Sequence, residues 1–463
     1  MVFFKKNELE IGMQFLEEGN FSSAIDCFKK FLEEHSKHPQ AQCCLAEAYF
    51  QNAQIDLAKQ VLIDLIKLSP SAEIISKILE ITNWKKLVSD NFFNSYFAFS
   101  PDGRKLVFVS VRRDSNGDGK LNIFDRGGIY LLDLATGEEK LLVTDDYYNT
   151  FPRFSPDNKK IVFVSARRDS NGDNIIDFQD NGSIYLLDLE TGRETMVLGD
   201  EYRPKFPSIF PDNKNLVCCG WDKSRQKSGI FMVGIDDGKI KKITPDQFES
   251  SFPVISPDGK KITYTSWRED TNEDGIINIR DNSGIYLFDL TTGREREIVD
   301  CQYDNSYPQW LPSGEGFVYL SRRRDTNNDE EINSLDNSGI YLFDLKRKKE
   351  RMLINDDYYN KFPSFVGNGR LLLYIGSCRQ AKRTTERDYF ENKGLYCFDL
   401  NNKEEKQLVS SKYYGCRFPV GSPVENKAAY LSWRKGSNRG IYLANLDRLP
   451  TKEELMAIVA ENL

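Results

Sequence analysis

Acidic and amide side chains recur at fixed spacing in four twelve-residue loops of this sequence. The loops are DSNGDGKLNIFD (114–125), DSNGDNIIDFQD (169–180), DTNEDGIINIRD (270–281) and DTNNDEEINSLD (325–336). In every copy, positions 1, 5 and 12 are Asp, position 3 is Asn, and position 9 is Asn or Asp. Alternate oxygen-bearing side chains of a tightly curled loop converge on one hard cation, so this spacing predicts a metal site.

The spacing resembles the calcium loop of EF-hand proteins with a closing Asp instead of Glu, and resembles its dockerin variant D-x-N-x-D-G-x-x-N-x-x-D more closely. The resemblance implies calcium bound by the side chains at positions 1, 3, 5, 9 and 12 and by the backbone carbonyl at position 7. The candidate ligands are Asp114, Asn116, Asp118, Lys120, Asn122, Asp125, Asp169, Asn171, Asp173, Ile175, Asp177, Asp180, Asp270, Asn272, Asp274, Ile276, Asn278, Asp281, Asp325, Asn327, Asp329, Glu331, Asn333 and Asp336.

The four loops are expected to bind calcium with different affinities. The loop at Asp169 offers four carboxylates, and the loops at Asp114 and Asp270 offer three each. The loop at Asp325 has Glu330 at the sharp turn, where a left-handed backbone costs a non-glycine residue about 1 kcal/mol or more, so it should be the weakest site. The alternative is that hairpin loops are rich in Asp, Asn and Gly because these residues suit turns. Calcium is favoured because positions 2, 4, 7, 10 and 11 vary while the oxygen positions do not.

The loops belong to a larger repeat that occurs seven times, with successive copies 46 to 56 residues apart. The copies begin at Tyr96, Phe151, Phe206, Phe252, Tyr307, Phe362 and Phe418. Within the second copy, strands are predicted at Pro152–Ser155, Lys160–Ser165, Ser183–Leu189 and Glu194–Leu198. Four short antiparallel strands repeated around a ring are typical of a β-propeller blade. The sequence therefore predicts a mainly β fold, a seven-bladed β-propeller.

This repeat resembles the TolB-like, WD40-like (PD40) propeller family, in its F-S-P-D-G-K-x-I-x-F-x-S opening and its I-Y-L-x-D-L-x-T-G ending. The resemblance covers roughly residues 84–447, although TolB itself is usually described as six-bladed. The last copy contains only three strands, so Trp84–Ser89 is expected to supply the fourth strand of the seventh blade. The third and sixth copies lack the acidic loop, so propeller folding does not require it.

Residues 1–83 are predicted to form a small all-α domain with a 34-residue repeat, because the pattern from Gly12 to Phe28 recurs from Ala46 to Leu62. This pattern resembles the tetratricopeptide repeat, with a capping helix at Ala72–Ile81. The resemblance implies a groove for a protein or peptide partner, and the alternative is a helical module that only packs on the propeller. The groove positions would be Lys6, Leu9, Met13, Gln40, Cys43 and Glu47.

The last residues, 448–463, are predicted to form a short C-terminal helix. A capping box at Thr451–Glu454 marks its start. An apolar side that includes Leu455 and Val459 is expected to dock on the propeller edge or on the N-terminal helices, because an exposed stripe of that size is unfavourable.

An arginine near the end of the second strand recurs in six copies, as Arg112, Arg167, Arg268, Arg323, Arg379 and Arg434. A ring of arginines that binds an anion is one interpretation. The preferred interpretation is that each arginine pairs with a nearby acid or stacks on a neighbouring tyrosine, because guanidinium groups suit both contacts. An aromatic residue four positions before each copy, such as Tyr147 or Tyr303, is expected to wedge between blades rather than to bind a ligand.

Composition narrows the class of protein. The chain has 463 residues, is 40% hydrophobic and carries a formal charge of -7, which argues weakly against nucleic-acid binding. No apolar stretch is long enough to span a membrane, and the first residues contain no secretory signal. Nine cysteines without a CxxC pair indicate a reducing compartment, so a cytoplasmic location is expected, with export by an unseen route as the alternative.

Catalysis has little support in the sequence, because the only histidines, His35 and His38, lie in the helical repeats. The propeller therefore contains no Ser-His-Asp triad and no histidine-bound metal. Paired carboxylates could still act on a glycosidic bond, but no pair stands out. The function predicted from sequence is a non-enzymatic protein-binding scaffold with calcium in four blades. The alternative is a carbohydrate-binding propeller, or a carbohydrate-active one that uses carboxylates.

Overall fold

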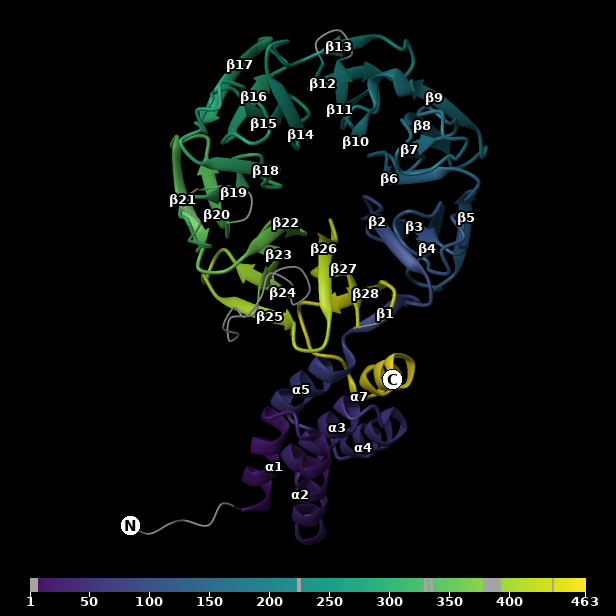
Figure 1. The fold of residues 1–463 in the computed structure, drawn as a ribbon, viewed down its shortest axis with the longest axis vertical. Coiled ribbons are helices and arrows are strands. Elements are labelled where there is room, and N and C mark those ends of the chain that lie inside the picture. Colours follow the sequence, from purple (N-terminus) through teal and green to yellow (C-terminus); the bar gives the residue numbers. More distant parts are fainter. Residues whose placement is uncertain (1–6, 223–225, 329–331, 333–335, 378–392, 435–436) are drawn as a thin grey trace. The chain divides into compact units, whose positions relative to one another are not determined.

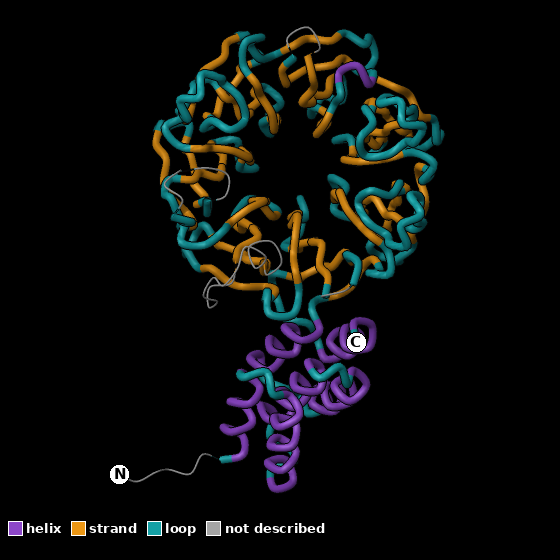
Figure 2. Tube along the Cα trace, in the orientation of Figure 1, coloured by secondary structure: helices purple, strands orange, loops and turns teal. Residues whose placement is uncertain are grey.

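The computed structural model describes residues 7–222, 226–328, 332, 336–377, 393–434 and 437–463. It contains a helical unit, Met1–Val88 with Tyr442–Leu463, and a strand-rich unit, Ser89–Ile441. Seven four-stranded antiparallel sheets are arranged around a ring (Figure 1), and helices occur at the two ends of the chain (Figure 2). The predicted seven-bladed propeller with N-terminal helices and a short C-terminal helix is confirmed.

Each blade has four strands, and the first strand of each lies nearest the middle of the ring (Figure 1). The inner strands are β2 (Phe93–Phe99), β6 (Tyr148–Phe154), β10 (Lys205–Ile209), β14 (Glu249–Ile255), β18 (Asp304–Trp310), β22 (Asn360–Val366) and β26 (Gly415–Gly421). The second strands are β3 (Lys105–Val111), β7 (Lys160–Ala166), β11 (Asn215–Asp222), β15 (Lys261–Trp267), β19 (Gly316–Arg322), β23 (Leu371–Ser377) and β27 (Lys427–Trp433).

The outer half of each blade follows the same order. The third strands are β4 (Gly128–Asp133), β8 (Ser183–Asp188), β12 (Lys227–Gly234), β16 (Gly284–Asp289), β20 (Gly339–Asp344), β24 (Lys393–Asp399) and β28 (Gly440–Asn445). The fourth strands are β5 (Glu139–Val143), β9 (Glu194–Leu198), β13 (Ile240–Lys242), β17 (Arg294–Val299), β21 (Lys349–Ile354), β25 (Glu405–Val409) and β1 (Lys85–Val88). A 3-10 turn, η1 (Asp200–Tyr202), precedes β10.

The seventh sheet has the order β1-β28-β27-β26, so the strand before the first copy supplies its outer edge as predicted. The strands predicted in the second copy also agree, except that β6 starts at Tyr148, four residues earlier than expected. Residues that the sequence placed in a turn are therefore part of the inner strand.

The core of the propeller lies between successive blades. Val162 and Ile184 of the second blade pack in one buried cluster with Leu216 and Phe231 of the third. The centre of the second strand carries a fully buried aromatic side chain in six blades, namely Phe108, Phe163, Tyr264, Tyr319, Tyr374 and Tyr430. Burial of these large side chains is the main source of stability, because each aromatic ring removes roughly 150–250 Å² from water.

A bulge interrupts every inner strand at the aromatic residue that opens the repeat. All seven of these residues have left-handed backbone, with φ from 42° to 55°, which is unfavourable for a bulky side chain. Neighbouring rings from Tyr96 round to Phe418 have centroids 4.2 to 6.2 Å apart. The bulges therefore turn one aromatic side chain per blade into a collar around the propeller axis.

The helical unit contains two helix pairs and a fifth helix, α1 (Glu8–Glu17), α2 (Phe21–Glu34), α3 (Pro39–Gln51), α4 (Ile55–Lys67) and α5 (Ala72–Thr82). Gly12 lies against the ring of Phe28, where a Cβ atom would meet a ring carbon at 2.6 Å. Gly19 and Ala53, which are 34 residues apart, both end a helix with left-handed backbone. The predicted groove residue Lys6 lies outside the described residues.

The C-terminal helix α7 (Lys452–Asn462) begins with the predicted capping box of Thr451 and Glu454. It packs within the helical unit, the second of the two predicted positions, since Lys59 donates to the carbonyl of Ala460 at 2.8 Å. Its last residue, Asn462, is buried and donates from Nδ2 to the carbonyls of Thr82 (2.8 Å) and Trp84 (2.7 Å).

Replacing Asn462 with Leu should lower the free energy of unfolding of the helical unit by about 2–4 kcal/mol. The substitution leaves two buried carbonyl oxygens without this donor, and an unsatisfied buried acceptor costs roughly 1–3 kcal/mol. Urea titration followed by helical circular dichroism measures the effect. Replacing the exposed Glu461 with Leu is the matched control and should change stability by less than about 0.5 kcal/mol. Equal midpoints for the two variants would contradict the prediction.

Candidate functional site

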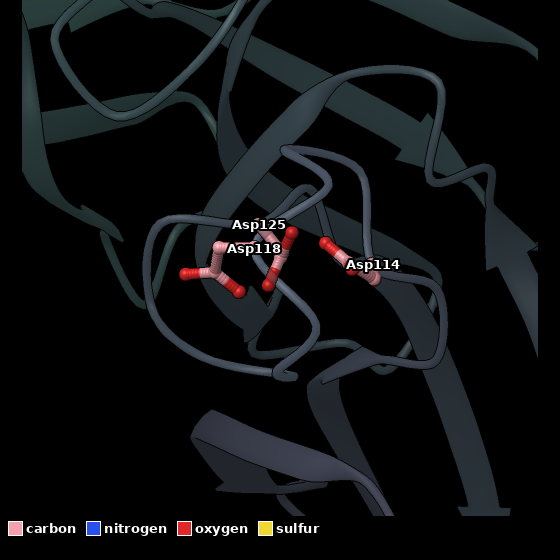
Figure 3. Close-up of side chains that lie close together, drawn as sticks. All are labelled: Asp114, Asp118 and Asp125. Atoms are coloured by element: carbon pink, nitrogen blue, oxygen red, sulfur yellow. The ribbon is translucent and has the colours of Figure 1, made fainter.

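The four acidic loops join the second and third strands of the first, second, fourth and fifth blades. In the first loop, the carboxylate oxygens of Asp114, Asp118 and Asp125 lie within 4.8 Å of one another. Figure 3 shows the three side chains close together within the curl of the loop. In the part of the chain that the structure describes, no other group of three acidic, histidine or cysteine residues meets this distance. These oxygens fit a hard divalent cation, which prefers carboxylate ligands.

Backbone hydrogen bonds hold each acidic loop in its curled form. Asp114 Oδ2 accepts from the amide of Gly119 at 2.8 Å, which ties position 1 to position 6. The buried Asp125 accepts from the amides of Ser115 (2.7 Å) and Asn122 (3.0 Å) and so joins the two ends of the loop. Asp118 Oδ2 accepts from Asn122 Nδ2 at 3.0 Å. A carboxylate oxygen has a second lone pair, so these bonds orient the ligands without preventing metal binding.

The second and fourth-blade loops repeat these contacts. Asp169 Oδ2 accepts from Asn174 N and Asp270 Oδ2 accepts from Gly275 N, both at 2.8 Å. Hydrogen bonds from the amides of Asn174 and Gly172 lower the pKa of Asp169, which keeps it charged. The left-handed backbone expected at position 6 is present at Gly119, Asn174 and Gly275.

The loops show a second left-handed position, and the fifth-blade loop is described only in part. Position 4 is also left-handed, even at Glu273 (φ 58°), which the sequence did not predict. In the fifth-blade loop, Asp325 accepts from the amide of Asn328 and Asp336 accepts from that of Thr326. Of the other four predicted ligands of that loop, Asn327 is described, and Asp329, Glu331 and Asn333 lie outside the described residues, as does Glu330.

The recurring arginines pair locally, as preferred above. Arg268 donates to both oxygens of Glu295 on the fourth strand of its blade, at 2.7 and 2.8 Å. Its guanidinium carbon lies 3.6 Å from the ring centre of Tyr286 and 5.0 Å from that of Phe248. Arg112, Arg167 and Arg323 repeat the acid pair and the stacking, and Arg434 stacks on Tyr414. Arg379 lies outside the described residues.

A second group of cations, which the sequence did not indicate, lies beside the aromatic collar in the fifth to seventh blades. We call Arg322, Lys361, Lys393, Arg417 and Arg439 the axial cation cluster. Lys361 and Arg417 directly precede the collar residues Phe362 and Phe418 on neighbouring inner strands. Arg322 and Lys393 are 4% and 6% exposed, and the other three side chains are partly buried.

Aromatic side chains form the walls of this cluster. The Nζ atoms of Lys393 and Lys361 lie 3.4 and 4.8 Å from the ring centre of Tyr359. The guanidinium carbons of Arg439 and Arg417 lie 5.4 and 5.8 Å from the ring centre of Trp433. Both contacts keep positive charge on the face of an aromatic ring, a favourable cation–π arrangement.

The cluster contains more positive charge than its described acids neutralise. Arg322 pairs with Asp304, but its buried Nε has no hydrogen-bond partner among the described residues. Lys361, Arg417 and Arg439 form no ion pair with any residue that the structure describes. Burial, with repulsion from Arg417 and other cations, lowers the pKa of Lys361 to about 8 and that of Arg439 to about 10. An anion would relieve this repulsion, so the cluster has the electrostatics of an anion site.

Known proteins that are similar to this chain include enzymes. No family model matches the chain. A segment of 122 residues, 26% of the chain, is 27% identical to dipeptidyl-peptidase 5 of Porphyromonas gingivalis and spans 16% of that protein's length. Oligogalacturonate lyase from Vibrio parahaemolyticus superposes with a TM-score of 0.54 and 15% identity, over 78% of this chain and 93% of the lyase.

Two further solved structures superpose on this chain. An oligogalacturonate lyase in complex with manganese superposes with a TM-score of 0.53 and 17% identity, over 79% of this chain and 92% of that one. TolB from Acinetobacter baumannii is a more distant neighbour, with a TM-score of 0.41 and 17% identity over 79% and 73% of the two chains.

The prediction of a non-enzymatic scaffold is therefore wrong, because the curated relative is a peptidase and the superposed propellers include lyases. That prediction relied on the absence of histidine from the propeller. Histidine is not required for catalysis, because buried lysine, arginine and tyrosine side chains can also bind, polarise and exchange protons with a substrate.

Proposed function

We propose that the propeller is part of an enzyme that acts on an acidic oligosaccharide, with a uronate carboxylate bound in the axial cation cluster. One observation carries the proposal: Lys361, Arg417 and Arg439 meet beside the collar without acidic partners among the described residues. Guanidinium groups match the planar, two-oxygen geometry of a carboxylate. The guanidinium of Arg439 lies over the rings of Phe93 and Trp433, and that of Arg417 lies over Trp433, so these rings hold the two cations in position.

The similarity to an oligogalacturonate lyase supports the sugar class, since the match extends over 93% of the lyase chain. In a lyase reaction on a uronate, neutralising the carboxylate makes the adjacent C–H bond more acidic. Arg417 and Arg439 are placed to supply this neutralisation. The propeller has no histidine that could bind a metal ion. The axial cation cluster would therefore neutralise the charge of the uronate carboxylate in place of a histidine-bound metal.

Turnover assays with the full chain test the proposal. Oligogalacturonate and other uronate oligosaccharides should be cleaved, and the neutral oligogalactose of equal length should not. Cleavage by elimination creates a carbon–carbon double bond next to the carboxylate, which ultraviolet absorbance and mass spectrometry detect. Hydrolysis of peptide substrates with no binding of any uronate would overturn the proposal and favour a peptidase, the class of the curated relative.

We also propose that the four acidic loops bind calcium, with the strongest geometric support at Asp114, Asp118 and Asp125. The amide contacts that pre-form the loops support this proposal, because they lower the cost of ordering the ligands. These loops are framed by strands and close with a short Asp, so we expect affinities of roughly 10⁻⁵ to 10⁻³ M.

Replacing Asp114 and Asp118 with Ala should remove one equivalent of calcium from chelator-treated protein, as measured by calorimetry. Wild-type protein should also gain several degrees in unfolding temperature at millimolar calcium, because the ion binds only the folded state. The matched control is Asp133→Ala, which removes an acid from a hairpin turn outside the loops. Absence of any calcium-dependent heat or stabilisation would exclude the calcium sites.

We propose that the helical unit binds a protein or peptide through its tetratricopeptide-like repeats, which affinity capture with the full chain would test.

We also propose a cytoplasmic location, because none of the eight described cysteines forms a disulfide. Among the described residues, no helix is long and apolar enough to cross a bilayer.

A further inference from the structure

Lys361 is the most accessible amine of the axial cation cluster. It lies on β22, directly before the collar residue Phe362, and its side chain is partly buried. Its Nζ atom has no hydrogen bond or ion pair to any residue that the structure describes, and it lies over the ring of Tyr359. The amine therefore keeps its lone pair accessible to a ligand once it loses its proton.

Charged groups from four other strands face this amine. Arg322 on β19, Arg417 on β26 and Lys393 on β24 are cations, and Asp304 on β18, which pairs with Arg322, is the acid. Burial and the two arginines lower the pKa of Lys361 to about 8, against an ordinary value of about 10.4. A substantial share of the amine is therefore neutral near pH 8, which is the state that attacks a carbonyl carbon.

We propose that Lys361 is a nucleophilic amine that forms an imine with a carboxylate-bearing aldehyde or ketone, whose carboxylate is held by Arg417 and Arg439. This inference rests on the anion site of the proposed function but not on the cleavage reaction. The open-chain reducing end of a uronate is itself a carboxylate-bearing aldehyde, so the two ligands share one chemistry.

The reaction balances without any further reagent. The lone pair of the neutral Nζ attacks the carbonyl carbon, and one amine proton passes to the carbonyl oxygen to give a carbinolamine. The carbon–oxygen bond then breaks, the second amine proton leaves with the hydroxyl group as water, and a carbon–nitrogen double bond remains. Neighbouring cations favour the negative charge that develops on the oxygen during attack.

Reductive trapping with the full chain tests the inference. Protein at pH 8 is mixed with glyoxylate or pyruvate and sodium cyanoborohydride, which delivers hydride to the imine carbon and fixes the adduct as a secondary amine. Peptide mass spectrometry should place the adduct on Lys361, at least about tenfold above the level at Lys205. Lys205 is the matched internal control, because it occupies the same position before the collar residue of the third blade and is exposed. Acetaldehyde, which has no carboxylate, should label Lys361 much less.

Two variants separate the nucleophile from the cation. Lys361→Arg keeps a positive charge without a nucleophilic amine, so it should still bind an acidic oligosaccharide but lose the adduct at this position. Lys205→Arg should leave the adduct at Lys361 unchanged within about twofold. Equal labelling of Lys361 and Lys205, or labelling of Lys361 that does not depend on the carboxylate, would overturn the inference. Labelling without uronate cleavage would refute the proposed reaction alone, and uronate cleavage without labelling would refute the imine alone.

Discussion

Replacing Arg417 and Arg439 together with Met should weaken binding of oligogalacturonate by at least about a hundredfold. A hydrogen bond between a guanidinium and a carboxylate contributes roughly 1.5–3 kcal/mol, and losing two of them corresponds to a factor of about 10² to 10⁴ in affinity. Methionine keeps an apolar stem of similar length beside Trp433 and removes the guanidinium group that lies over this ring, so the loss should reflect charge rather than folding. Calorimetry at two salt concentrations measures the affinity.

The control for this double variant is Arg370→Met. Arg370 directly precedes β23 and pairs with Asp399, the last residue of β24. It does not belong to the axial cation cluster. The Arg370→Met variant should bind oligogalacturonate with the affinity of the wild-type protein. Single replacement by Lys at Arg417 should cost less than replacement by Met, because the charge is kept and only the forked geometry is lost. An affinity unchanged in the double variant would remove the cluster as the anion site.

The propeller could be predicted from the sequence because the residues that determine each blade lie close together in the chain and recur in seven copies. Each copy carries its own turn and its own alternating strands, so Lys160–Ser165 or Glu194–Leu198 could be located within a residue of the observed ends. The closing strand at Lys85–Val88 could be inferred by counting, since the last copy lacks a fourth strand. The early start of the inner strand was missed because polar residues such as Asn149 resemble a turn but are buried, with side chains that donate to backbone carbonyls.

The acidic loops could be predicted for the same reason, since all ligand positions lie within twelve residues. Their left-handed position 6 follows from residue type at Gly119 and Gly275. Residue type gave no indication of the second left-handed position at Glu273, because glutamate has no preference for that conformation.

The axial cation cluster could not be predicted, because it is not a motif. Lys361 and Arg417 occupy the same position in two copies, where other copies have Ser95, Thr150 or Ser306. Arg439 comes from the loop that precedes β28 and meets Arg417 over the ring of Trp433 within the seventh blade. The sequence offers one indication of the cluster: in only three of the seven copies is the residue before the collar aromatic basic.

Replacing Arg268 with Met should lower the stability of the propeller by about 3–5 kcal/mol. Arg268 and Glu295 are mostly buried, with side chains 14% and 21% exposed, and they form two parallel hydrogen bonds of 2.7 and 2.8 Å. Removing one partner leaves the other charge buried and unpaired, which costs several kcal/mol. The exposed pair of Arg113 and Asp145 provides the control, since Arg113→Met should cost less than about 1 kcal/mol.

A double-mutant cycle with Glu295→Met shows whether the loss comes from the unpaired charge. The double variant should be more stable than Arg268→Met alone, because no charged group then remains buried without a partner. Recovery should be incomplete, since the hydroxyl of Tyr264 also donates to Glu295 and the ring of Tyr286 loses its stacked guanidinium. Thermal unfolding of the four proteins at constant calcium gives the coupling energy. Strictly additive single and double effects would mean that Arg268 stabilises its blade through packing on Tyr286 and Phe248 and not through its pair with Glu295.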